Sequence, residues 1–118
     1  MAFHGTFEHS LDAKNRLTVP AKFRAALAGK VFLVRGPDPC ISLYPEATYS
    51  TLTTAALEGM NPFSAQAREL KRLFHSTATD TELDSAGRVM LTPRHLEHAS
   101  IDREVVITGA GDCLELWD

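Results

Sequence analysis

Alternating apolar and polar positions near the start of the chain predict two short strands around a turn. Phe7 and Leu11 precede the polar stretch DAKNR, and Leu17 and Val19 follow it. Alternation with a period of two residues is typical of β-strands, and Asp and Asn are frequent in tight turns. We therefore predict a β-hairpin whose loop occupies residues 12–16.

The pattern then changes to a short helix and two further strands. Pro20 stands where a helix can begin, because its fixed φ suits the first helical turn, and Phe23 and Leu27 lie on one face of that helix. The apolar run at 31–34 predicts a buried strand, and after a Gly-Pro turn the segment 40–44 predicts a closing strand. The first part of the chain therefore has the predicted order β-β-α-β-β.

The same pattern recurs in the last third of the chain. DAKNR begins at Asp12, and the similar DSAGR begins 72 positions later, at Asp84. The segments CISLY at 40–44 and CLELW at 113–117 correspond in the same way, and Pro93 precedes a second short helix. Each copy has about forty residues, which is near the lower limit for a unit that folds alone. The two copies are therefore expected to fold together.

Between the copies, the composition changes to one that favours helices. Pro45 opens a predicted helix that runs to about Leu57, GMNP interrupts it, and a second helix begins at about Ser64. The predicted apolar faces consist of Tyr49, Leu52 and Ala56 in the first helix and Ala67, Leu70, Leu73 and Phe74 in the second. We predict an α+β protein with one repeat at 5–47, a helical connector at 48–75 and a second repeat at 76–118.

The charge of the chain is unevenly distributed. The net charge of −3 and the pI near 5.9 argue weakly against a nucleic-acid partner, because affinity for DNA comes largely from Lys and Arg. Residues 1–47, however, carry six basic and four acidic side chains, whereas residues 76–118 carry three basic and nine acidic ones. The first half can therefore approach phosphate. Its candidate contacts are the loop residues Lys14, Asn15 and Arg16, with Lys22 and Arg24 just behind that loop.

A purely structural interpretation of the two loops is also open. Asp12 and Asp84 are typical turn-forming residues, because an Asp carboxylate accepts hydrogen bonds from N–H groups two residues further on. Arg16 fits an ion pair with Asp12 as well as it fits a ligand contact. Acidic neighbours surround Arg88 in the sequence and favour an ion pair there. Asn15 occupies a position where a left-handed backbone conformation is tolerated.

Other chemistry finds little support in the sequence. His95 and His98 share a helix face, but two histidines without further ligands are a weak zinc signal, and a solvated helix face is the better interpretation. Cys40 and Cys113 occupy equivalent places in the two copies, which favours packing. No glycine-rich phosphate loop or nucleophile motif is present. We therefore expect no enzymatic activity, metal, cofactor or small-molecule substrate, and, without a membrane span or signal peptide, a cytoplasmic protein.

The motifs together resemble the MraZ family of the SpoVT/AbrB superfamily. The resemblance covers essentially the whole chain and rests on DAKNR and DSAGR, RLTVPAKFR, CISLYP, the MNP at 60–62 and the terminal ELWD. It implies two AbrB-like swapped-hairpin repeats that form a small β-barrel. It also implies a sequence-specific transcriptional regulator of the bacterial division and cell-wall gene cluster, located in the cytoplasm on the nucleoid.

The resemblance further implies how such a regulator acts. A ring-shaped homo-oligomer is expected to bind repeated boxes in double-stranded promoter DNA through its D-x-x-x-R loops. Carried over by position, Lys14 and Arg16 are the main contact candidates and Arg88 is their counterpart. The alternative from another class is an oligomeric platform for protein interactions without direct DNA readout.

Overall fold

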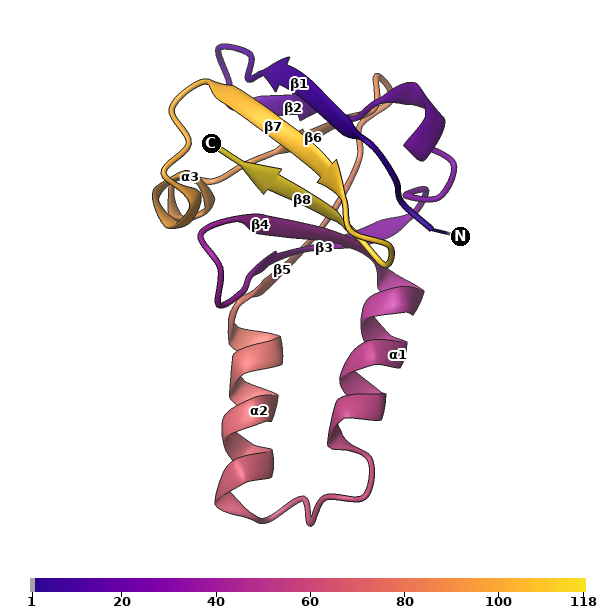
Figure 1. Cartoon of the computed structure of the whole chain (residues 1–118), viewed down its shortest axis with the longest axis vertical. Helices are drawn as coiled ribbons and strands as arrows, with labels where there is room; N and C mark the ends of the chain where they lie inside the picture. Colours follow the sequence, from indigo (N-terminus) through magenta and orange to yellow (C-terminus); the bar gives the residue numbers. More distant parts are fainter. Residues whose placement is uncertain (1) are drawn as a thin grey trace.

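Within residues 2–118, which the computed structural model describes, eight strands form a β-rich body from which two helices project (Figure 1). The strands are β1 (Thr6–Ser10), β2 (Arg16–Thr18), β3 (Lys30–Arg35), β4 (Ile41–Pro45), β5 (Ala78–Glu82), β6 (Arg88–Met90), β7 (Glu104–Gly109) and β8 (Leu114–Trp117). The helices are the 3-10 turn η1 (Ala21–Phe23), α1 (Glu46–Leu57), α2 (Ala65–Ser76) and α3 (Pro93–Ala99). The predicted α+β class is confirmed.

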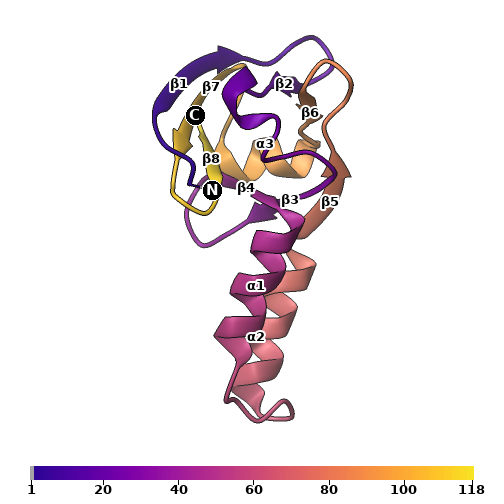
Figure 2. The ribbon, with the colours of Figure 1, turned by 90° about the vertical axis from the view of Figure 1, so that its right-hand side faces the viewer.

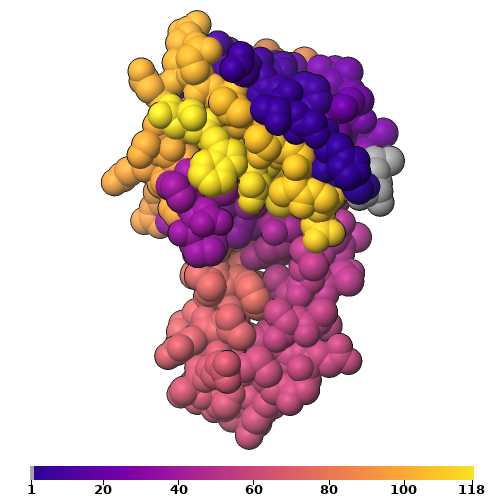
Figure 3. Space-filling model, viewed as in Figure 1, coloured from indigo at the N-terminus to yellow at the C-terminus, as the bar shows by residue number. Residues whose placement is uncertain are grey.

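The strands form two antiparallel sheets. Six strands follow the order β1-β7-β8-β4-β3-β5, and β2 and β6 form a separate two-stranded ribbon. Strands from the two ends of the chain lie side by side, since Phe7 of β1 is opposite Ile107 of β7 (Figure 3). In the same way, β5 of the second copy pairs with β3 of the first, with Thr79 opposite Leu33. Each copy therefore completes the sheet of the other.

The two predicted local hairpins are wrong. The strands before and after each D-x-x-x-R loop do not pair with each other; one joins the six-stranded sheet and the other joins the ribbon. The physical reason is burial. Leu17 and Val89, at the centre of the ribbon, have no exposed surface, because the ribbon packs its inner face onto the large sheet. An isolated two-stranded hairpin has no second layer to cover such residues.

The core lies between the ribbon and the inner face of the large sheet. Alternate positions of each central strand point inward, as the two-residue period of a strand requires. The buried members include Leu33, Ile41, Leu43, Ile107, Leu114 and Leu116, and Phe3, Phe23 and Leu27 belong to the same cluster. Cys40 and Cys113 are buried and not bonded to each other, as expected for packing residues.

The two short helices after the ribbon strands differ. After Pro20 the chain makes only a single 3-10 turn, whereas Pro93 begins the seven-residue helix α3. The sequence favours a solvated face for His95, but the side chain is only 1% exposed and its Nδ1 accepts the Thr92 backbone N–H at 3.1 Å. A backbone N–H can only donate, so Nδ1 carries no proton there. Burial lowers the pKa of His95, which favours the same neutral form.

The helical connector forms as predicted, with one change of face. Pro45 caps α1, the GMNP segment separates the helices, and Ser64 caps α2 by accepting the Ala67 N–H at 3.2 Å. Figure 2 shows α1 and α2 leaving the body together. The inward face of α1 runs through Tyr49 and Thr53, whereas the predicted face residues Leu52 and Ala56 are exposed. The reason lies in tertiary contacts, since the Tyr49 ring packs against the rings of Phe32 and Tyr44 and its hydroxyl donates to the Phe74 carbonyl oxygen.

In the second helix, the predicted apolar face is buried only in part. Ala67 is buried and Leu70 and Phe74 are half-buried, but Leu73 is 46% exposed. Among the helices of residues 2–118, none has the length and apolar character that crossing a membrane requires.

The burial of the ribbon gives a first prediction. Leu17→Ala should lower the free energy of unfolding by about 2–5 kcal/mol, because it leaves a cavity between the ribbon and the large sheet. Met90→Ala is the matched control, since Met90 lies in the partner strand but is 53% exposed, and its effect should stay within about 0.5 kcal/mol. Urea denaturation followed by circular dichroism measures both. Equal losses in the two variants would contradict the two-layer arrangement.

Candidate nucleic-acid interface

The first D-x-x-x-R loop is held by the carboxylate of Asp12. Its Oδ1 accepts the backbone N–H groups of Lys14 and Arg16, each at 2.9 Å, and its Oδ2 accepts Nε–H of Arg16 at 2.7 Å. The backbone closes the same turn, since Asp12 N–H donates to Arg16 carbonyl oxygen at 3.0 Å. Asn15 takes the left-handed conformation, with φ of 58°. One carboxylate thus fixes both the turn and the direction of the Arg16 guanidinium.

The second loop repeats this geometry. Asp84 Oδ1 accepts the N–H groups of Ala86 at 3.0 Å and Arg88 at 2.9 Å, and Oδ2 accepts Nε–H of Arg88 at 2.9 Å. Gly87 takes the left-handed position, with φ of 76°. Each Asp therefore forms a turn and an ion pair at once, and the two interpretations of the loops that the sequence left open describe one network.

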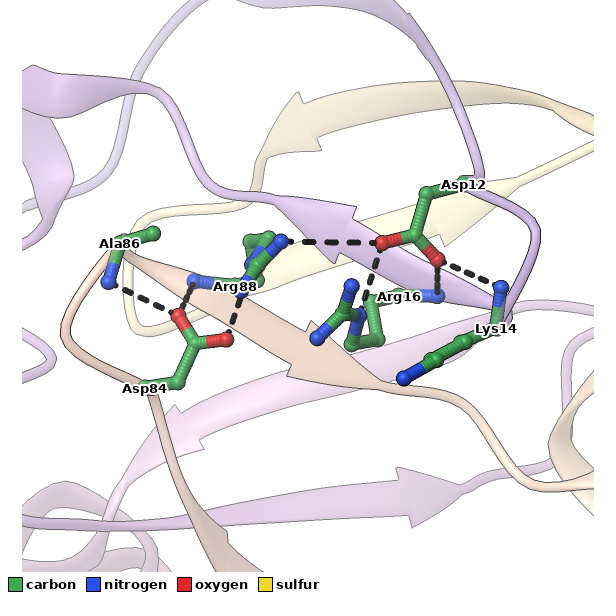
Figure 4. A network of polar contacts seen from close by, with 6 residues as sticks. All are labelled: Asp12, Lys14, Arg16, Asp84, Ala86 and Arg88. Atoms are coloured by element: carbon green, nitrogen blue, oxygen red, sulfur yellow. Dashed lines mark hydrogen bonds and ion pairs between the residues drawn. The ribbon is translucent and has the colours of Figure 1, made fainter.

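The β2–β6 ribbon brings the two loops into one site. Because the strands are antiparallel, the loops lie at opposite ends of the ribbon while Arg16 and Arg88 point toward the middle (Figure 4). Arg88 Nη1 lies 4.0 Å from Asp12 Oδ2, so the two networks touch. Residues 72 positions apart in the sequence thus share a single surface.

The outer face of the ribbon carries the side chains that are open to a ligand. Leu17 and Val89 point inward, so the alternate positions point outward; these are Arg16, Thr18, Arg88 and Met90. The Arg16 side chain is 25% exposed and that of Arg88 is 33% exposed. Both guanidinium groups are oriented by the protein and still reachable.

The backbone hydrogen bonds at the two ends of the ribbon show which facing residues of β2 and β6 have the closest side chains. Leu91 N–H donates to Asn15 carbonyl oxygen and Val19 N–H donates to Gly87 carbonyl oxygen, each at 2.9 Å. Hydrogen-bonded and non-hydrogen-bonded pairs alternate along an antiparallel ladder, so Arg16 and Met90, which are directly opposite, form a non-hydrogen-bonded pair. Side chains of such pairs approach closely. The same holds for Thr18 and Arg88.

The electrostatics keep both carboxylates charged. The backbone N–H of Arg16 is the largest cause that holds the pKa of Asp12 below its usual value, and Arg88 has the same effect on Asp84. A depressed pKa means that the ionised turn is favoured above the unfolded value and that this contribution disappears only as the pH falls through the folded value. At neutral pH both loops therefore keep their geometry.

Lys14 is exposed at the tip of the first loop, and its counterpart in the second loop, Ala86, carries no charge. Asn15 is also exposed. Lys22 lies away from any carboxylate contact, with Nζ 4.8 Å above the Phe7 ring and 5.0 Å above the Phe23 ring. Lys14 lies on the same loop as Arg16, with its backbone N–H bonded to the same Asp12 carboxylate.

Arg24 lies at the second loop, whereas the sequence placed it behind the first. Its Nε donates to Val19 carbonyl oxygen at 3.1 Å, and its side chain packs over Gly87. The positive φ of Gly87 favours glycine, and a Cβ at this position would displace the Arg24 side chain from its place over the turn. Arg24 therefore braces the turn that presents Arg88.

The acidic residues that surround Arg88 in the sequence separate in the structure. Asp80 belongs to β5 in the large sheet and lies 3.9 Å from Lys30 Nζ, whereas Arg88 belongs to the ribbon and bonds to Asp84. Sequence reasoning also missed Thr18 and Met90 as members of the site. The available signal was the two-residue period that starts at each arginine.

A metal centre finds no support in the described part of the chain. Residues 2–118 contain no group of three or more His, Cys, Asp or Glu side chains placed to hold an ion. Burial raises the pKa of Cys40 and of Cys113 to about 11, so both thiols stay protonated at neutral pH. His98 Nε2 lies 3.0 Å from Asp38 carbonyl oxygen, a contact that a neutral or charged ring makes by donating.

Comparison with known proteins gives the same family twice. The family model described as MraZ protein matches residues 2–73 and again residues 74–118. Curated relatives are named Transcriptional regulator MraZ, which is a non-enzymatic role for those proteins. The relative from Lactiplantibacillus plantarum is 41% identical over 115 residues, covering 98% of this chain and 81% of the relative.

Two further relatives come from other bacteria. The protein of Thiobacillus denitrificans is 40% identical over 120 residues, and that of Corynebacterium urealyticum is 39% identical over 118 residues; both alignments cover 98% of this chain and 80% of the relative. The aligned regions therefore include both loops and the connector between them. This chain belongs to the MraZ family.

Proposed function

We propose that this chain is a transcriptional regulator that binds double-stranded promoter DNA through the outer face of the β2–β6 ribbon and its two loops. The observation that carries the proposal is the convergence of Arg16 and Arg88 on one exposed face, each with its guanidinium oriented by an aspartate. The names of the relatives, which describe transcriptional regulators, support the same conclusion.

The geometry suits base recognition. A two-stranded β-ribbon fits into the major groove of B-DNA, where an Arg can donate two parallel hydrogen bonds to O6 and N7 of guanine. In both loops the hydrogen bond to the aspartate uses Nε, at the base of the guanidinium. The terminal nitrogens of Arg16 and Arg88 are the donors we assign to guanine. Holding the side chain in advance lowers the entropic cost of binding.

Phosphate contacts position the protein without specifying sequence. Lys14, exposed at the tip of the first loop, is the main candidate, with Asn15 beside it. Lys22 and Arg24 are secondary, because Lys22 already lies over two aromatic rings and Arg24 is bonded to Val19. The net charge of −3 is then compatible with DNA, because the contact surface draws on a few local basic groups.

The finer parts of the proposal follow the family resemblance. We infer that the two copies, 5–47 and 76–118, exchange strands to form an AbrB-like swapped-hairpin barrel. The connector at 48–75 joins the two copies. Several chains in a ring would present several ribbons to repeated boxes upstream of the division and cell-wall genes, on the nucleoid in the cytoplasm. Linked binding of this kind raises avidity by about 10²–10⁴.

The first test replaces the arginines. Arg16→Ala and Arg88→Ala should each weaken binding to DNA from upstream of the gene that encodes this chain by about 10- to 100-fold, because each removes a bidentate base contact. Arg72→Ala, which removes an exposed arginine of α2, is the matched control and should bind like the parent. Mobility shift gives the affinities, and circular dichroism checks that each variant is folded. Unchanged affinity in both ribbon variants would exclude the ribbon as the reading surface.

The second test separates DNA binding from an oligomeric platform for protein interactions. Lys14→Ala should weaken binding equally for specific and unrelated DNA and should reduce the slope of log affinity against log salt by about 1, because one phosphate contact is lost. Fluorescence anisotropy at several salt concentrations measures the slope. Association with promoter DNA that is absent, or insensitive to salt in the parent protein, would favour the platform.

A further inference from the structure

The two halves of the ribbon are related by an approximate two-fold symmetry. The axis exchanges the loops, so that Asp12 corresponds to Asp84, Arg16 to Arg88 and the buried Leu17 to Val89. The hydrogen bonds of the two turns agree atom for atom. A surface with this symmetry would read two equivalent half-sites on DNA.

Two outward positions break that symmetry. Lys14 corresponds to Ala86, and Thr18 corresponds to Met90. Met90 is 53% exposed, although Met is an apolar residue, and it stands directly opposite Arg16 in a pair whose side chains approach closely. Within β6, Val89 is the residue that packs into the core, where it is fully buried. The fold itself therefore gives no reason for an apolar side chain at position 90.

The chemistry of the major groove offers one partner for such a side chain. The C5-methyl group of thymine is the apolar feature of the base edges there, and it is read by apolar contact. Methionine is long, unbranched and polarizable, so it can reach and follow such a surface. Thr18 is shorter and ends in a hydroxyl and a methyl close to the strand. The two halves of the ribbon thus differ, because Met90 and Thr18 differ in both length and polarity.

We propose that Met90 is a specificity-determining residue that contacts a thymine methyl next to the guanine assigned to Arg16, and that one chain therefore reads an asymmetric DNA site. The inference rests on the proposed function. Arg16 fixes the neighbouring guanine, and the cross-strand partner of Arg16 then lies over the adjacent base pair. Because Thr18 fills the corresponding place beside Arg88, the other half-site has no matching requirement for thymine.

A second copy of the chain is a poorer partner for this face. Symmetric pairing of two ribbons would bring Arg16 and Arg88 of one copy against the same arginines of the other. The repulsion between these like charges opposes association of two ribbons, whereas DNA supplies the opposite charge. The position of Met90 between two oriented guanidinium groups favours a nucleic acid.

The experiment compares promoter DNA with the same DNA in which deoxyuridine replaces thymidine, a change that removes only the C5-methyl groups. On a probe with a single box, the parent protein should bind the thymidine form roughly fourfold more tightly, the factor expected for burial of one methyl group. Met90→Gln, which is similar in length but polar, should abolish this ratio. Met90→Leu, which stays apolar, should keep it. Fluorescence anisotropy gives the six dissociation constants of the three proteins on the two probes, and sedimentation gives the oligomer mass.

The outcomes separate this inference from the proposed function. If the parent binds neither probe, the DNA-binding function itself fails. If the parent binds and Arg16→Ala does not, but Met90→Gln keeps the thymidine preference, the function stands and the role of Met90 is wrong. A changed oligomer mass in Met90→Gln would assign Met90 to a contact between copies and would also overturn the inference. The symmetric variant Thr18→Met should add a thymidine preference in the other half-site.

Discussion

The antiparallel pairing of β2 with β6 is the constraint on which the rest of the structure depends. It brings Leu17 and Val89 together as one fully buried layer over the large sheet, so the core is closed by residues from both copies. The same pairing sets the two D-x-x-x-R loops at opposite ends of one short ribbon and turns their arginines toward its centre. Neither copy can form this arrangement alone, because each supplies only one of the two strands.

Strand exchange explains why a chain of 118 residues forms one body in which the acidic residues of β5 and the arginines of the ribbon lie in different sheets. β1 and β5 leave their local neighbours and complete the sheet on the other copy, which satisfies backbone groups that a lone repeat would leave at its edges. The acidic residues of β5 accompany that strand into the large sheet, where Asp80 lies near Lys30. The ribbon keeps its two arginines, and each is balanced by one aspartate of its own loop. A surface that presents two guanidinium groups and an acidic second half of the sequence are therefore compatible.

The aspartates show how a structural element and a functional one can share the same atoms. Asp12 closes a turn with one carboxylate oxygen and aims Arg16 with the other. Arg24 supports the second turn from behind, through Val19 and the space left by Gly87. The orientation of the proposed base contacts thus depends on turn chemistry, which is why the structural and functional interpretations of these loops are not in competition.

The sequence by itself determined the repeat, the α+β class, the helical connector and the turn residues, because these depend on local periodicity and on neighbours a few positions apart. It also indicated Arg16 and Lys14 as candidate contacts. Only the tertiary structure decided which strands pair, and the predicted hairpins were wrong because alternation specifies a strand but not its partner. For the same reason, only the tertiary structure placed Thr18 and Met90 beside the arginines. It also showed that Arg24 lies at the second loop and that His95 is buried. These contacts join residues that are far apart in the chain. Burial against a second layer of structure selects the strand pairing that forms, and no local sequence pattern contains that information.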